Sequence, residues 1–215
     1  MHELYVRAHR LIRKVVHEVL HLYLTATLFT LISIERDCYG YVKYRMRTIL
    51  GMVTIRMAQD SDIQAITDIY NQAVSAGGST ADLQPRTIEQ RLEWVHSHTP
   101  REQYPVIVME ENHQVIAFGS LSRFHPRSGY DGVVELSYYV DEGARGHGAA
   151  TAMVQWLLDE AKHRGHRMAT ALIFADNAGS IALMEHYGFS RFGLLPRACY
   201  DGSRFLDMSY WCKEL

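Results

Sequence analysis

Arg145-Gly146-His147-Gly148-Ala149-Ala150 stands between an apolar run at residues 133–140 and a segment with helical spacing. Its small residues would let the backbone approach a ligand closely, and the free N–H groups at the start of a helix bind phosphate. The stretch departs from the dinucleotide-binding pattern, because Thr151 occupies the third glycine position, and it lacks the Lys-Ser/Thr pair of a P-loop. By itself it indicates either a pyrophosphate-binding turn or a glycine-rich turn without a ligand.

The sequence on both sides of this turn alternates between strand and helix patterns. Asp60-Ser61 supplies capping side chains for a first helix, Gly77-Gly78 ends it, and Thr87-Ile88-Glu89-Gln90 reads as a capping box for a second. Strands are expected at residues 54–58, 104–110, 114–123, 133–140 and 168–174 and on both sides of Asp201-Gly202, and helices at 63–74, from 87, from 149 towards Gly165, and at 180–187. The order β-α-α-β-β-β-α-β-α-β-β predicts an α/β domain.

The composition is that of a folded protein with one sizeable core. The 215 residues are 47% hydrophobic and 21% charged, with a formal net charge of −2. Acidic and basic residues are interspersed, so the basic stripe expected of a nucleic-acid-binding surface is absent from the sequence. The cysteines are Cys38, Cys199 and Cys212, without a CxxC pair, which argues against a disulfide framework or a cysteine zinc site and favours a cytoplasmic location.

The first fifty residues have a different character. A basic cluster precedes the apolar stretch from Val19 to Ile34 and consists of Arg7, Arg10, Arg13 and Lys14. That stretch has about 16 residues where a spanning helix needs about 20, so no membrane insertion is expected. We therefore treat residues 1–51 as an N-terminal extension and residues 52–215 as the domain, with Met52 as an alternative start.

One motif in the extension has a chemical meaning of its own. His17-Glu18-Val19-Leu20-His21 matches HExxH, in which two histidines one helical turn apart bind zinc and the glutamate activates water. The competing interpretation is a chance string in a histidine-rich segment, because no third ligand follows at the spacing of zinc proteases. The chance interpretation is favoured, and no metal is expected in the domain.

Two motifs together resemble those of the GNAT superfamily of N-acetyltransferases. Arg145-x-x-Gly148-x-Ala150 resembles its pyrophosphate-binding signature, and residues 176–189, DNAGSIALMEHYGF, resemble its second motif at the expected distance. Residues 69–74, 104–106, 134–137 and 205–207 look like the phosphinothricin acetyltransferase branch, so the resemblance covers about Val53 to Leu215. It implies the GNAT fold, in which a splayed, mixed and mostly antiparallel sheet flanked by helices holds acetyl-CoA. It also implies a homodimer and, as acceptor, an amino acid analogue such as phosphinothricin or methionine sulfoximine.

The resemblance also assigns residues to the cofactor. It places Ser137, Tyr138 and Tyr139 on the strand that faces the pantetheine and acetyl group, and Asn177, Ser180 and His186 near the pantetheine and phosphate end. The pyrophosphate falls to the six residues of the opening motif: Arg145, Gly146, His147, Gly148, Ala149 and Ala150. The family more often has lysine where His186 stands, and Met184 replaces the tyrosine or histidine that donates a proton to the leaving thiolate.

A carboxylate and a loop are assigned to the acceptor. Glu135 alternates on one strand face with Val133 and Ser137, and a carboxylate there must be satisfied or functional. The resemblance implies a general base, which an ammonium acceptor requires; a structural ion pair is the alternative. Arg127 and Tyr130 are candidate ligands for a substrate carboxylate, although Ala81 stands where the branch often has an aromatic residue.

The function predicted is therefore transfer of acetyl from acetyl-CoA to the primary amine of a small molecule. Within that class the alternative acceptors are a protein N-terminus and an antibiotic amine. Outside it, the alternatives are an acyl-CoA-binding regulator without turnover and an HExxH zinc hydrolase. Neither a nucleic acid nor a membrane is an expected partner.

Overall fold

The structure is a computed structural model that describes residues 30–36, 42–48 and 51–215, with side chains from Val53 onward. The chain divides into two compact units, residues 1–54 and 55–215. In the first unit, β1 (Thr30–Arg36) and β2 (Val42–Thr48) pair antiparallel. The HExxH residues, 17–21, lie outside the described residues. In the described parts of the chain, no helix is long and apolar enough to cross a membrane.

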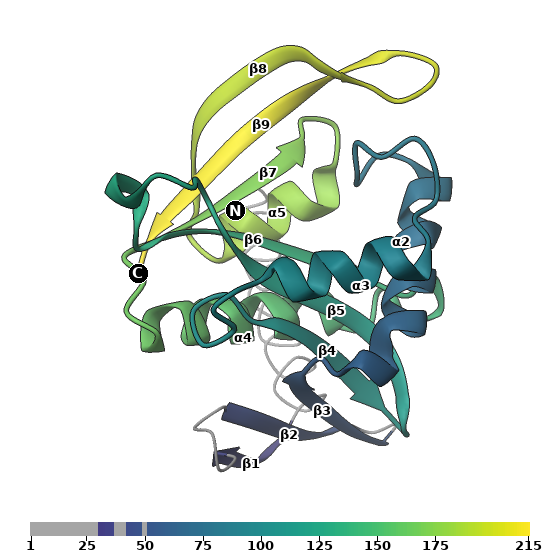
Figure 1. The fold of residues 1–215 in the computed structure, drawn as a ribbon, viewed down its shortest axis with the longest axis vertical. Helices are drawn as coiled ribbons and strands as arrows, with labels where there is room; N and C mark the ends of the chain where they lie inside the picture. The colour runs from purple at the N-terminus through teal and green to yellow at the C-terminus, as the bar shows by residue number, and fades with distance from the viewer. Residues whose placement is uncertain (1–29, 37–41, 49–50) are drawn as a thin grey trace, which may run out of the picture. The chain divides into compact units, whose positions relative to one another are not determined.

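The domain follows in the predicted order of elements (Figure 1). Its strands are β3 (Gly51–Met57), β4 (Val106–Glu111), β5 (Gln114–Arg123), β6 (Val133–Val140), β7 (Met168–Phe174), β8 (Ser190–Tyr200) and β9 (Phe205–Glu214). Its helices are α2 (Ile63–Ala76), α3 (Ile88–Ser97), α4 (Ala149–His163) and α5 (Ala178–His186). The predicted α/β class is confirmed.

The domain's strands form a mixed sheet in the order β3-β4-β5-β6-β7-β9-β8. The pairs β4/β5, β5/β6, β7/β9 and β8/β9 are antiparallel, and β6/β7 is parallel. That parallel pairing covers only Val133–Glu135 of β6 against Met168–Thr170 of β7. Beyond Glu135, β6 continues with β5 as its partner, so the sheet splays between β6 and β7 as predicted.

Helices cover both faces of the sheet. On one face a core cluster joins α2, α3, β4 and β5 through Ile66, Val95, Val108 and Phe118. The next residue on β5, Gly119, points to the opposite face, where an added Cβ would lie 3.1 Å from Leu157 and 3.2 Å from Met153 of α4. Helices α2 and α3 therefore cover one face of β5, and α4 covers the other.

The helix boundaries agree with the sequence at two places and differ at one. Thr87 and Gln90 form the predicted capping box, with N–H to oxygen distances of 3.3 and 3.0 Å, and Gly77 ends α2 with a φ of 70°. The prediction that Asp60-Ser61 caps α2 is wrong. These residues form a short 3₁₀ turn, in which the carboxylate of Asp62 accepts the N–H of Gln59 at 2.8 Å.

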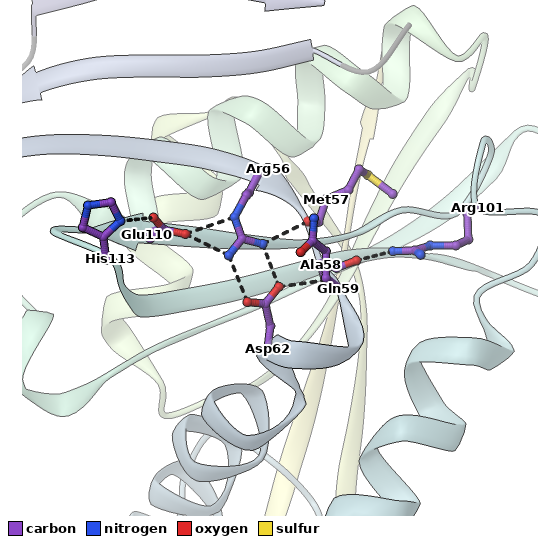
Figure 2. A network of polar contacts seen from close by, with 8 residues as sticks. All are labelled: Arg56, Met57, Ala58, Gln59, Asp62, Arg101, Glu110 and His113. Atoms are coloured by element: carbon purple, nitrogen blue, oxygen red, sulfur yellow. Dashed lines mark hydrogen bonds and ion pairs between the residues drawn. The ribbon is translucent and has the colours of Figure 1, made fainter. Parts of the chain in front are cut away.

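Asp62 is also part of a charged network that joins β3, the start of α2 and β4 (Figure 2). Arg56 of β3 donates to Asp62 at 2.7 and 2.9 Å and to Glu110 of β4 at 2.8 and 3.1 Å. Burial acts to raise the pKa of Asp62, but hydrogen bonds from Arg56 and Gln59 outweigh it and hold the pKa below its ordinary value. The hydrogen bond to Asp62 in turn raises the pKa of Arg56.

Candidate functional site

The splay leaves one edge of β6 without a strand partner. Ser137, Tyr138 and Tyr139 all lie beyond the last residue that pairs with β7. The hydroxyl of Tyr138 is buried, and the Ser180 hydroxyl of α5 lies near it. Burial raises the pKa of Tyr138, and the nearby hydroxyl of Ser180 on α5 opposes that shift. The backbone polar groups on the free edge of β6 fit a polar, extended ligand.

The turn before α4 presents a row of free amides. Gly146 and Gly148 have φ values of 79° and 86°, in the left-handed region that favours glycine. Gly148 is the N-cap without a side-chain cap, and the first helical bond runs from Ala152 N to the Gly148 carbonyl at 3.0 Å. The preceding amides therefore lack helical partners. A Cβ at Gly146 would meet nothing within 4 Å, so the space beside this turn is open.

The other residues of the motif at 145–150 lie on the same turn as these amides. His147 is exposed and Ala149 is buried. Arg145 folds back so that its Nε donates to the Val140 carbonyl at 3.2 Å, and its side chain is exposed. The structure thus gathers residues 145–150 on a single turn at the positive end of α4, where an anion is favoured.

The α5 residues fall into two groups. Asn177 is the N-cap: its Oδ1 accepts the Ser180 N–H at 3.0 Å, and its Nδ2 donates to the Gly78 carbonyl at 3.1 Å. Asn177 and Ser180 therefore lie near the splay and the loop that follows α2. His186 is exposed at the opposite end of the helix, with its ring 5.0 Å from that of Tyr187.

No proton donor stands at the family's usual place. Met184 is fully buried. Tyr187 donates its hydroxyl to the Thr151 carbonyl at 2.8 Å, and burial raises its pKa to about 12. Tyr187 therefore ties α5 to α4, which is a structural role.

Glu135 lies on the α2/α3 face of β6. It is half-buried, and no ion pair or hydrogen bond joins its carboxylate to another described residue. Burial raises its pKa. The structural alternative for Glu135, a balancing arginine, is thus not found in the described part of the chain, and the carboxylate is free to accept a proton.

A row of hydroxyls and an imidazole lies beside Glu135. Ser122, its cross-strand partner on β5, is 2.9 Å from His98 Nε2, and Ser120 is 3.0 Å from Ser137. Burial lowers the pKa of His98. The neutral imidazole therefore donates from Nδ1 to the Trp94 carbonyl at 2.8 Å and accepts at Nε2 from Ser122. Sequence reasoning missed His98, because only the fold brings it to β5.

Farther along the same face, aromatic rings surround the guanidinium of Arg91 on α3. Tyr139 stacks on Phe118 at 5.1 Å and meets the Tyr70 ring edge-on at 5.0 Å. The guanidinium of Arg91 lies over the Tyr70 ring, 3.6 Å from its centroid, and 4.7 Å from that of Trp94. Nothing in the sequence marks Arg91 beyond its place in an amphipathic helix.

The loop between β5 and β6 contains the two predicted substrate residues. Arg127 and Tyr130 are both exposed, and the Tyr130 ring lies 4.6 Å from that of His125. The loop enters β6 two residues before Glu135, but no contact joins Arg127 or Tyr130 to that carboxylate in the described structure. Within the same range, no group of three His, Cys, Asp or Glu side chains could hold a metal ion.

Comparisons with known proteins place these features in a family context. The profile of the acetyltransferase (GNAT) family matches residues 63–189. The phosphinothricin acetyltransferase-like protein YwnH of Bacillus subtilis (strain 168) is 38% identical over 165 residues, which cover 76% of this chain and 99% of that protein. An L-methionine sulfoximine/L-methionine sulfone acetyltransferase of Salmonella typhimurium is 32% identical, covering 76% and 95%.

Solved acetyltransferase structures have the same fold as this domain. The phosphinothricin acetyltransferase of Sinorhizobium meliloti in complex with acetyl-CoA superposes with a TM-score of 0.72 at 30% identity, covering 76% of this chain and 88% of that one. The Salmonella typhimurium structure of yncA with acetyl-CoA gives a TM-score of 0.71 at 32% identity, covering 76% and 94%.

Proposed function

Because the chain belongs to the acetyltransferase (GNAT) family, we propose that its parted strands β6 and β7 receive acetyl-CoA and that Glu135 prepares the acceptor amine. The protein is an acetyl-CoA-dependent N-acetyltransferase acting on a small amine. The acceptor class we propose is an amino acid analogue such as phosphinothricin or methionine sulfoximine, because similar proteins are named as acetyltransferases of these compounds. The observation that carries the proposal is the splay itself, placed beside an uncapped helix N-terminus.

The residues present fit acetyl-CoA. The free amides before α4 and the open space at Gly146 suit its pyrophosphate, and the edge of β6 beyond Glu135, which has no strand partner, suits the polar pantetheine arm. When bound, acetyl-CoA supplies an activated acetyl thioester. Asn177, whose side-chain amide is engaged at both ends, would hold the surrounding loops in place.

Glu135 has the properties of a general base. Its carboxylate lacks an ion-pair partner among the described residues, and burial moves its pKa from the ordinary value towards the working range of a base. It would take the proton of the acceptor ammonium, so that the nitrogen lone pair forms the new C–N bond while the C–S bond breaks. Free N–H groups of β6 would stabilise the negative oxygen that develops. A thiol pKa of about 8.5 allows departure as thiolate, which agrees with an apolar Met184.

An amine panel read out by thiol release tests the function. We expect turnover with phosphinothricin, methionine sulfoximine and methionine sulfone, and little with an aminoglycoside or a peptide with a free N-terminus. A peptide or antibiotic acceptor that outperformed every amino acid analogue would overturn the acceptor class. Acetyl-CoA binding without thiol release on any amine would favour a regulator.

A homodimer in a reducing cytoplasm completes the proposal. The β8/β9 hairpin exposes large apolar side chains that a second copy would cover: Phe192, Leu194, Leu195, Tyr200 and Phe205. Cys199 and Cys212 are both free thiols, as a reducing compartment allows. Light scattering at micromolar concentration tests the oligomer, and we expect Leu195→Glu to shift it to a monomer.

A further inference from the structure

Arg91 of α3 is a buried cation. Its exposed fraction is 4%, and its guanidinium is packed over the rings of Tyr70 and Trp94. Removing a charged group from water is costly unless an anion of matching geometry accompanies it. Aromatic faces return part of that cost, but they do not replace an anion.

No such anion is supplied by the described residues. None of their carboxylates forms an ion pair with Arg91, and its Nε is buried without a hydrogen-bond partner. Burial accordingly lowers the pKa of Arg91, although the guanidinium remains charged at neutral pH. The nearby anion, Asp82, is already occupied, because it accepts from the Tyr70 hydroxyl at 2.6 Å and from Arg86. Asp82 therefore acts on Arg91 through its charge alone, while its ion-pair partner is Arg86.

The position of Arg91 connects it with the reaction. Tyr70, under the guanidinium, touches Tyr139, which shares a strand face with Glu135. Glu135 and Tyr139 are four positions apart on β6, and Ser137 lies between them on the same face. The α2/α3 face therefore has a proton acceptor, Glu135, on β6 and, reached through Tyr139 and Tyr70, a guanidinium without a carboxylate partner among the described residues.

We propose that Arg91 binds the oxyanion of the acceptor, a carboxylate or a phosphinate, and so selects amines that carry a negative group. This rests on the proposed function and names its substrate class. The planar guanidinium offers parallel donors to two oxygens of such a group. The exposed loop residue Arg127 is a separate arginine, and the proposal for Arg91 does not require it.

Arg91→Met tests the proposal with four acceptors that differ only in their anions. Methionine sulfone carries a carboxylate, its α-carboxamide carries no anion, (3-aminopropyl)(methyl)phosphinate carries only a phosphinate, and phosphinothricin carries both. We expect kcat/KM to fall about 100-fold for the acceptors whose oxyanion Arg91 binds and less than about threefold for the carboxamide. The single-anion acceptor that suffers the loss identifies the oxyanion. Arg91→Lys, which keeps the charge without the planar donors, should recover part of it.

The controls separate binding from folding. Arg197→Met removes an arginine that also stacks on an aromatic ring, that of Phe205 at 4.8 Å, and should leave the ratio between methionine sulfone and its carboxamide unchanged. A purely structural role for Arg91 predicts equal losses for all four acceptors, and that result would overturn the proposal. Calorimetric titration with methionine sulfone, wild type against Arg91→Met, gives a readout that does not need turnover. An absence of thiol release would contradict the proposed function, whereas equal methionine sulfone affinity in both proteins would contradict the role of Arg91.

Discussion

Glu135 is a half-buried carboxylate with a raised pKa, and its protonation has consequences for both rate and stability. We expect Glu135→Gln to keep acetyl-CoA affinity and to lower turnover by about 10²- to 10⁴-fold, the usual cost of losing a general base. The wild-type rate should fall as pH drops through the raised pKa of Glu135, and the variant should lack that step. Its deficit should shrink at high pH, where more amine arrives already deprotonated.

Stability gives an independent check on Glu135. A carboxyl whose pKa is higher in the folded protein than in the unfolded chain favours folding below the unfolded pKa, and that contribution is lost as pH rises through the folded pKa. Glu135→Gln should therefore be more stable than wild type at neutral pH and lose that advantage in acid. Glu142→Gln, at an exposed carboxylate, is the control. A variant that turned over within about twofold of wild type from pH 6 to 9 would remove Glu135 as base.

Gly148 combines a left-handed backbone with the free amides of α4. Gly148→Val should weaken acetyl-CoA binding severely, because a branched side chain would stand where the pyrophosphate approaches. The strain of a positive φ is matched in Gly202→Val, at a turn with a φ of 99° and open surroundings. Titration calorimetry on both folded variants should show lost affinity only for Gly148→Val. Equal affinities would contradict the assignment of the pyrophosphate turn.

At the scale of elements, the charged network of Figure 2 joins β3, the start of α2, and β4. We expect Arg56→Met to lower the free energy of unfolding in urea by about 2 kcal/mol, because Asp62 loses its cationic partner while it stays buried. Arg204→Met is the matched control, since Arg204 also pairs with two carboxylates but on the surface, and its effect should stay below about 0.5 kcal/mol.

The same network fixes a pH dependence. The pKa of Asp62 is lower in the folded state, so its contribution to stability is present above the unfolded value of 3.8 and is lost as pH falls through the folded pKa. Arg56→Met should move this loss to higher pH. Wild-type-like acid unfolding in the variant would show that the network carries no such coupling.

The elements were largely predictable because their signals are local. The strand at 133–140, the strand at 168–174 and the Thr87 capping box each depend on a few consecutive residues. The cap of α2 was not predicted correctly. Asp60, Ser61 and Asp62 offer similar side chains, and the hydrogen bonds that distinguish Asp62, from Arg56 and Gln59, depend on how the chain turns between β3 and α2.

The candidate site residues could be predicted from the sequence only where they belong to a family motif. Gly148 and Ser180 were identified through family motifs that lie on single turns. Arg91 and His98 were missed, because their meaning depends on partners more than twenty residues away in sequence, such as Tyr70 and Ser122. Periodicity marks which side of a helix is buried, but it does not report whether a buried charge has a partner.

At the scale of the whole molecule, both GNAT motifs, at residues 145–150 and 176–189, and the charged network lie in residues 55–215. We expect a chain that begins at Met52 to fold and to bind acetyl-CoA with the affinity of the full chain, as measured by thermal unfolding and calorimetry. An insoluble or inactive product, beside an active full chain, would show that the first unit is needed by the domain.

The hydrogen bond from Asn177 to the Gly78 carbonyl connects the proposed acetyl-CoA site with the loop after α2. We therefore expect the binding of acetyl-CoA and the binding of the acceptor to be coupled. Asn177 caps α5, beside the strand proposed to bind acetyl-CoA, and Gly78 begins the loop whose Thr80 and Asp82 hydrogen-bond Tyr70. We expect bound acetyl-CoA to order this loop and so to tighten acceptor binding. Because binding coupling is reciprocal, the acceptor must then tighten acetyl-CoA binding by the same factor. The affinity ratio measured for either substrate, with and without the other, should therefore exceed one and be equal, and Asn177→Ala should bring both ratios towards one together.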